Sequence, residues 1–375
     1  MIYLDNAATT YPKPEEVYAA LDKANREYSF NAGRGGYKNS KYVSKIIDET
    51  RAEIGSFVNC PGDRTIFTTS STEALNIIIF GLEWNKGDNV YVSPFEHNSV
   101  MRPLNEIKNR YDINIIQIPF EKDTWQLDSS FEDLLILNNP KCIICSSKSN
   151  MTGYNLPTKE IFKYGKKYNA ITILDASQSF GVDKTISNEK TDFIVFAGHK
   201  SLYASFGIAG FININNAYLK PYLYGGTGSD SLNLNMPSSG TSHLEAGSKN
   251  AIAIYGLHES IKWVKQHDIE GKEKKLFMYL YNSLKKLDKI IMYLPTNLDN
   301  CCGILSFNVK DYLAEEVGDI LDQEFDICVR TGYHCCPYIH DFIDSKKFNG
   351  TVRVSMNYFN EKEDIDRLIE ALKTL

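Results

Sequence analysis

The chain has 375 residues, 43% of them hydrophobic and 23% charged, and its formal net charge is −6. This length predicts about two to three domains, and the composition excludes disordered, collagenous and coiled-coil proteins. The chain is slightly acidic and has no stripe of clustered lysines and arginines, which argues against a nucleic-acid partner. No apolar run approaches the roughly 18 residues of a membrane span, and no signal peptide is visible. We therefore expect a cytoplasmic protein without membrane contact, whose eight cysteines are reduced thiols.

Helical spacing of apolar residues alternates along the chain with short apolar runs typical of strands that are buried on both faces. Up to about residue 250, helices are predicted at 14–28, 41–57, 72–82 and 159–168. Strands are predicted at 65–68, 89–92, 113–118, 142–145, 171–174, 193–196 and 208–214. Such alternation predicts an α/β fold with a mostly parallel sheet wrapped by helices.

The pattern changes after residue 250. Helices at 251–266, 269–287, 312–323 and 362–372 accompany strands at 303–309 and 351–356. The simplest division is a large α/β domain over 14–250 and a smaller α+β domain formed by 1–13 and 251–375.

Two charged residues follow predicted strands at the sheet edge where α/β proteins bind ligands. Lys200 comes after the strand at 193–196, and burial there would make its amine a nucleophile toward carbonyl groups. Asp175 follows the run at 171–174 and could pair with a metal, a sugar hydroxyl or a protonated pyridine nitrogen; Gln178 lies three residues on. A solvated loop lysine and a helix N-cap aspartate are the alternatives.

Two further loops join strands to helices. Ser70 and Glu73 have capping-box spacing, and such a helix start can also bind a phosphate through free backbone N–H groups. His97 follows another strand, where a neutral imidazole could stack on a flat cofactor or move protons. A plain helix cap and a structural surface histidine are the alternatives.

Cys335 is the most reactive-looking thiol, because His334 and Arg330 are nearby and cationic neighbours favour a thiolate. An inert loop cysteine is the alternative. Cys142 and Cys145 form a C-x-x-C motif inside a predicted strand without a second metal-spaced pair, so we expect core residues and no metal site. Together, a phosphate cap, a stacking histidine, an aspartate, a lysine and a cysteine loop predict a pyridoxal phosphate site.

The ordered set of these motifs resembles the fold-type I pyridoxal phosphate enzymes of aminotransferase class V. More narrowly, it resembles the cysteine desulfurases, nearest their group II (SUF-type) branch. The resemblance runs end to end and is carried by Tyr3–Thr10, Ser71–Glu73, Glu96-His97, Ser149-Asn150, Leu174–Gln178, Gly198–Lys200, Glu245–Gly247, Arg330–Gly332 with His334-Cys335, and Val352-Arg353. It implies a large domain with a mostly parallel, seven-stranded type of sheet.

The resemblance also implies a role for each matching residue. Lys200 would bind the cofactor covalently, His97 would stack on its ring, Asp175 would pair with the ring nitrogen and Gln178 with the ring oxygen. The phosphate would be held by Ser71, Thr72 and His199, and by Ser248 from the neighbouring subunit of a homodimer. Asn150 and Arg353 would hold the carboxylate of L-cysteine, and Cys335 would accept its sulfur for transfer to an acceptor protein.

Three departures from the family pattern matter. Ser248 replaces a usual threonine but keeps the hydroxyl. Ala197 stands where many members have a serine near the phosphate, and the segment Ser201–Gly207 lacks the usual Gly-Pro. A selenocysteine lyase, another class V lyase or aminotransferase, and a non-catalytic scaffold therefore remain alternatives, and Cys336 is left either as a local sulfur carrier or as inert.

Overall fold

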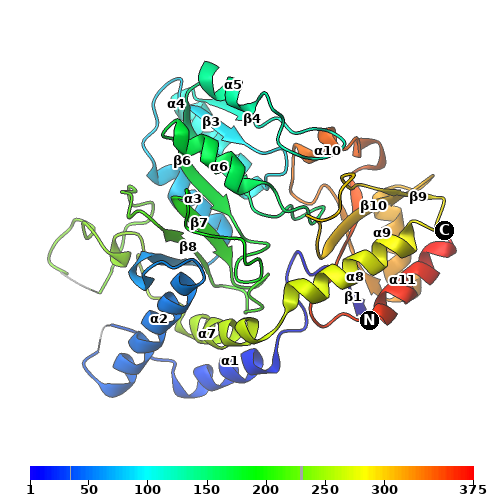
Figure 1. Cartoon of the computed structure of the whole chain (residues 1–375). Helices are drawn as coiled ribbons and strands as arrows, with labels where there is room; N and C mark the ends of the chain where they lie inside the picture. The colour runs from blue at the N-terminus through cyan, green and yellow to red at the C-terminus, as the bar shows by residue number, and fades with distance from the viewer. Residues whose placement is uncertain (34, 229–230) are drawn as a thin grey trace.

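The computed structural model describes residues 1–33, 35–228 and 231–375, and its largest element is a seven-stranded sheet (Figure 1). The strand order is β2-β8-β7-β6-β5-β3-β4. Every neighbouring pair is parallel except the two that involve β8. The strands are β2 (Thr65–Thr68), β3 (Asn89–Val92), β4 (Asn114–Gln117), β5 (Pro140–Ser146), β6 (Ile171–Asp175), β7 (Phe193–Ala197) and β8 (Ala209–Asn213). The predicted mostly parallel, seven-stranded α/β architecture is confirmed.

Helices cover both faces of this sheet, which explains why its strands are so uniformly apolar. On β5, Cys142 and Ile144 pack with α3 and α4, whereas Ile143 and Cys145 point into the other core, with α6. Both cysteines of the C-x-x-C motif are thus fully buried core residues, as predicted. The helices of this part are α1 (Glu15–Glu27), α2 (Lys38–Ser56), α3 (Ser71–Gly81), α4 (Asn98–Tyr111), α5 (Phe131–Leu137) and α6 (Thr158–Lys167).

A four-stranded antiparallel sheet of order β12-β13-β10-β9 lies beside the large one. Helix α8 runs from the end of α7 toward it, and both chain termini lie on this side (Figure 1). The elements are α7 (Ala251–Gln266), α8 (Ile269–Leu284), β9 (Ile290–Met292), β10 (Ile304–Val309), α9 (Ala314–Phe325), β11 (Ile327–Cys328), β12 (Arg330–Gly332), α10 (Ile339–Phe342), β13 (Thr351–Ser355) and α11 (Lys362–Lys373). The division into domains of 14–250 and of 1–13 with 251–375 stays a prediction.

The first residues of the chain join this second sheet region. Strand β1 (Ile2–Tyr3) pairs in parallel with β11, and Asp5 bridges to Ser355 at the end of β13. The segment that follows β1 therefore runs between the two sheets, where Asn6, Ala7 and Thr10 line a cavity of about 30 Å³.

The segment after Lys200 is also tied to the second region. Tyr203 is fully buried, and its hydroxyl accepts a hydrogen bond from the Tyr358 N–H at 2.9 Å. Its ring packs on Trp263 of α7 and on Phe359. The segment Ser201–Gly207, which lacks the Gly-Pro of the family that the sequence resembles, thus contains a buried tyrosine that packs on the second region. None of the helices in the described ranges is long and apolar enough to cross a membrane.

Candidate active site

Five loops meet at the carboxyl edge of the parallel strands and enclose a cavity of about 90 Å³. Its lining comes from the ends of β2, β3, β5, β6 and β7, the edge at which open α/β sheets bind ligands. The lining residues are Ser70, Ser71, Thr72, His97, Ser99, Ser146, Lys148, Asn150, Asp175, Ser177, Gln178, His199 and Lys200. The structure therefore brings together all the predicted site residues except Cys335, Arg353 and Ser248.

One end of the cavity suits a phosphate. Ser70 is the N-cap of α3 and accepts a hydrogen bond from the Glu73 N–H at 3.2 Å. The Glu73 carboxylate accepts from the Thr69 N–H at 2.7 Å, one residue earlier than a standard capping box requires. The helix start thus lies at the cavity, with the positive end of its dipole there. His199 Nδ1 is buried without a partner among the described residues, and it could donate a hydrogen bond to an oxygen of an anion.

Asp175 and Lys200 face the cavity from neighbouring strands. Asp175 is the last residue of β6, and its Oδ1 accepts a hydrogen bond from the Ser177 N–H at 3.0 Å. The alternative of a helix N-cap is wrong, because a turn follows it instead of a helix. Burial lowers the pKa of Lys200, although Asp175 opposes this shift. The amine therefore has the desolvated environment that a nucleophilic lysine needs.

His97 is held in one neutral form. It is the N-cap of α4, and its Nδ1 accepts a hydrogen bond from the Ser99 N–H at 3.0 Å. Burial and the nearby charge of Lys200 lower its pKa to about 4. Its Nε2 consequently carries the proton at neutral pH, so the ring is uncharged and can lie against a flat group. The surface-histidine alternative does not fit this burial.

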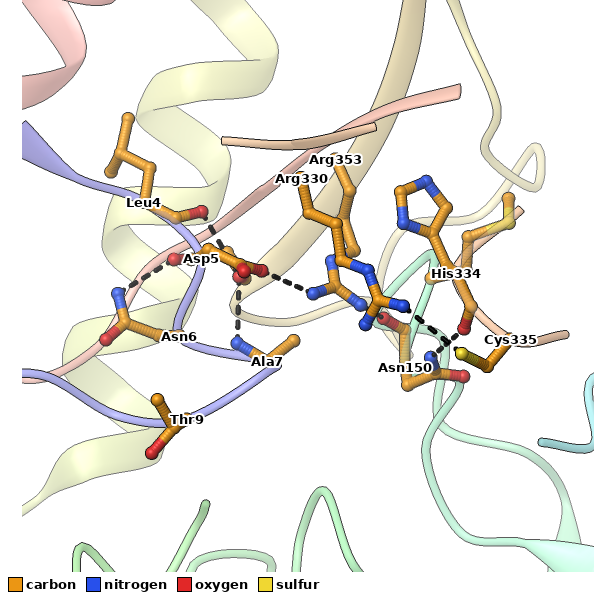
Figure 2. A network of polar contacts seen from close by, with 12 residues as sticks. Leu4, Asp5, Asn6, Ala7, Thr9, Asn150, Arg330, His334, Cys335 and Arg353 are labelled. Carbon is orange, nitrogen blue, oxygen red and sulfur yellow. Dashed lines mark hydrogen bonds and ion pairs between the residues drawn. The ribbon is translucent and has the colours of Figure 1, made fainter. Parts of the chain in front are cut away.

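Cys335 lies in a tight turn next to Asn150, which is one of the residues that line the cavity (Figure 2). The Cys336 N–H donates to the Tyr333 carbonyl at 3.0 Å, and the two central residues, His334 and Cys335, have φ of 48° and 58°. Two left-handed residues in succession are typical of a type I′ turn, which normally uses Asn-Gly. Neither residue here is glycine, so the turn is strained and must be held by its surroundings.

Three contacts hold this turn. The Cys335 carbonyl accepts from the Asn98 N–H at 2.7 Å, and the His334 carbonyl accepts from Asn150 Nδ2 at 3.0 Å. Arg330 Nη2 lies 3.2 Å from Cys335 Sγ, close enough to stabilise negative charge on the sulfur (Figure 2). The thiol is partly exposed, so reagents and partner molecules can reach it.

Arg353 is fully buried on β13 and joins three segments (Figure 2). Its Nη2 lies 2.5 Å from Asp5 Oδ1, and its Nη1 donates to the Asn150 carbonyl at 2.8 Å. Its Nε is buried without a partner among the described residues. The guanidinium is therefore fixed next to Asn150, which itself lines the cavity.

Ser248 is not among the residues that line the cavity; it lines a second pocket, which Thr69 and Glu73 at the start of α3 also line. Its loop is anchored by Glu245, whose carboxylate forms a buried pair with Arg51 at 2.6 Å.

Two buried charged residues at the site were not assigned a role from sequence. Glu96 is 1% exposed and accepts hydrogen bonds from the Ser146 N–H at 2.7 Å and the Ser146 hydroxyl at 2.8 Å. Burial raises its pKa to about 7. Burial opposes the charged form of Lys148, yet the neighbouring Cys302 and Glu273 raise its pKa. A charged residue shortly after an apolar strand was the available signal for both. No group of three metal-ligating side chains occurs within the described residues.

Comparison with known proteins gives a consistent result. The family described as aminotransferase class-V matches residues 2–368. A probable cysteine desulfurase of Pyrococcus abyssi is 32% identical over 100% of this chain and 94% of its own. A cysteine desulfurase of Wigglesworthia glossinidia brevipalpis is 30% identical over 99% and 92%. The apo structure of a cysteine desulfurase from Thermococcus onnurineus superposes with a TM-score of 0.92 at 28% identity, covering 100% of this chain and 94% of that one.

Proposed function

The chain belongs to the class V aminotransferases and, among them, to the cysteine desulfurases, and we propose that it converts L-cysteine to L-alanine and takes up the sulfur as a persulfide on Cys335. The observation that carries this proposal is the strained turn that presents a partly exposed thiol 3.2 Å from Arg330, next to the cavity that Lys200 lines. An unreactive loop cysteine would need neither the neighbouring Arg330 nor a strained backbone.

The cavity residues fit pyridoxal phosphate. The start of α3 with Ser71 and Thr72 would take the phosphate, together with the unpartnered His199 Nδ1. Asp175 would face the ring nitrogen and His97 the ring, while Lys200 would be the covalent attachment point. When bound, this group supplies an electron sink for the substrate Cα carbanion.

The chain's own residues then have distinct tasks. Arg353 and Asn150 would orient the substrate carboxylate, and the Lys200 amine would move the proton at the substrate Cα. The Cys335 thiolate attacks the substrate sulfur, so that a Cys335–sulfur bond forms while the substrate C–S bond breaks toward Cβ. Protonation of Cβ gives alanine, and the sulfane sulfur stays on Cys335. The sum is cysteine plus thiol giving alanine plus persulfide.

Two finer points extend the proposal. Ser248 lies outside the cavity of its own chain, which supports a homodimer in which this residue completes the partner's phosphate site. The short, tightly bonded cysteine turn supports a group II type of enzyme, since such a turn cannot carry sulfur away. An acceptor protein would then have to come to Cys335 and would accelerate slow basal turnover.

The test measures alanine and sulfide from L-cysteine, after the purified protein has been supplied with cofactor and its visible spectrum recorded. Cys335→Ala should lose cysteine turnover and keep the spectrum, whereas Cys328→Ala, on β11, should keep both. Retained turnover in Cys335→Ala, or a preference for selenocysteine, would favour the selenocysteine lyase alternative. An unreactive, colourless protein would favour the scaffold.

A further inference from the structure

The second thiol of the cysteine pair, Cys336, makes a specific contact with the site. Its side chain is 1% exposed, and its Sγ donates a hydrogen bond to Asn150 Oδ1 at 2.7 Å. The same amide donates from Nδ2 to the His334 carbonyl at 3.0 Å. One side chain thus bridges two residues of the turn around Cys335.

This pair of bonds fixes which way the Asn150 amide faces. An amide oxygen only accepts and an amide nitrogen only donates, so the His334 carbonyl selects the nitrogen, and the protonated Cys336 thiol then donates to the oxygen. Nδ2 carries two protons, of which one goes to His334. The other is available to a ligand in the cavity that Asn150 lines.

The thiol is suited to donate and not to attack. Burial raises the pKa of Cys336 to about 12, so the sulfur keeps its proton at neutral pH. A thiolate could not donate to Oδ1, and sulfur transfer from Cys335 would require a thiolate attacking the terminal sulfur of the persulfide. Cys335, by contrast, is partly exposed and faces Arg330.

We propose that Cys336 is a positioning residue: its thiol orients the Asn150 amide, and through that amide it holds the left-handed turn that presents Cys335. That the oriented amide binds the substrate carboxylate rests on the proposed function. That it holds the turn around Cys335 does not, because this concerns only contacts within the chain.

The test compares Cys336→Ala, which removes the donor, with Cys336→Ser, which keeps one. The first readout is the rate at which iodoacetamide alkylates Cys335 in cofactor-free protein, followed by peptide mass mapping. Losing one neutral hydrogen bond should speed alkylation of Cys335 roughly two- to tenfold in Cys336→Ala. In Cys336→Ser the alkylation rate of Cys335 should stay within about twofold of the wild-type rate. Cys142→Ala, which removes a buried cysteine from β5, is the matched control and should leave the rate unchanged.

The second readout uses the enzyme with cofactor. Cys336→Ala should raise KM for cysteine by roughly the same two- to tenfold factor, with less effect on kcat, and Cys336→Ser should restore KM. Persulfide trapped by alkylation should map to Cys335 in the wild type.

Three outcomes would overturn the proposal: an unchanged Cys335 alkylation rate in Cys336→Ala, an equal loss in Cys336→Ser, or sulfane sulfur found mainly on Cys336. If the wild type has no desulfurase activity but the alkylation rates follow the expected order, the proposed function fails while the positioning role stands.

Discussion

Arg353 and Asp5 form an ion pair of 2.5 Å although 348 positions separate them in the chain. The guanidinium is fully buried, and the side chain of Asp5 is 21% exposed. A buried cation is costly unless it is paired, so this contact both stabilises the fold and fixes the cation next to Asn150.

Replacing Asp5 should therefore destabilise the protein. Asp5→Asn keeps the shape and leaves the Arg353 charge unpaired, which we expect to lower the free energy of unfolding by about 2–3 kcal/mol. This lies below the roughly 3–5 kcal/mol typical of a fully buried pair, because Asp5 is partly hydrated. Denaturant titration measures the change. As a control, Asp22→Asn, in the exposed pair with Arg26, should change the free energy of unfolding by less than about 0.5 kcal/mol.

Replacing Arg353 tests its expected substrate contact. Arg353→Lys keeps the charge and loses the fork that reaches Asp5 and Asn150 together. A charged hydrogen bond to a carboxylate contributes about 1.5–3 kcal/mol, so KM for cysteine should rise roughly ten- to hundredfold. Steady-state kinetics measures this. An unchanged KM alongside a loss of stability would assign Arg353 a purely structural role.

Lys200→Ala should abolish turnover, since no other described lysine combines a buried position in the cavity with a lowered pKa there. Cofactor added to the variant should bind only reversibly, and dialysis should remove it. Alanine formation and the visible spectrum report the two effects. Lys262→Ala, in an exposed pair on α7, should behave as the wild type. Near-normal alanine production would remove Lys200 from its proposed role.

Glu96 should make stability depend on pH. Its pKa is about 7 in the folded protein against 4.5 as the ordinary value, so the folded state binds more protons between these pH values. The stabilising contribution of the neutral carboxyl is complete below pH 4.5 and is lost as the pH rises through 7, in total about 3 kcal/mol. In Glu96→Gln the decline should be smaller by this amount, and the part due to Glu273, whose pKa burial also raises to about 7, should remain. Glu106→Gln, in an exposed pair with Arg110, should retain it. If the unfolding free energies of the wild type and Glu96→Gln have the same pH dependence, the raised pKa does not belong to Glu96.

The buried pair of Arg51 and Glu245 should control the loop that carries Ser248. Glu245 also accepts a hydrogen bond from the Phe67 N–H at 2.7 Å, so it joins the loop to β2. Glu245→Gln leaves Arg51 unpaired and should cost about 3–5 kcal/mol of unfolding free energy. We also expect weaker cofactor binding, measured by dialysis of the coloured protein. If Glu245→Gln lowers stability but leaves cofactor retention unchanged, the loop has no part in holding the phosphate.

Most of the central sheet could be predicted because burial on both faces forces near-continuous apolar runs, as in β6 and β7. The strand ends then place Asp175 and Lys200 at one edge without any knowledge of their side-chain contacts. Helix α4 was not predicted, although Val100, Leu104 and Ile107 have helical spacing, because Pro103 interrupts the pattern.

The geometry of the cysteine turn could not be predicted. A type I′ turn is normally signalled by Asn-Gly, whereas His334 and Cys335 carry no such signal. Their left-handed conformation is set by partners far away in the sequence, Asn98 and Asn150. For the same reason, the pairing of Asp5 with Arg353 and the orientation of Asn150 by Cys336 lie beyond any local pattern.

The pairing of β1 with β11, and of Asp5 with Arg353, has a consequence for synthesis on the ribosome. At about 5–20 residues per second, the 348 positions between Asp5 and Arg353 take roughly 17–70 s to translate. Until β11 has been made, β1 has no strand to pair with, and until β13 has been made the Arg353 partner of Asp5 is missing. All strands of the large sheet are therefore translated long before Asp5 can pair with Arg353.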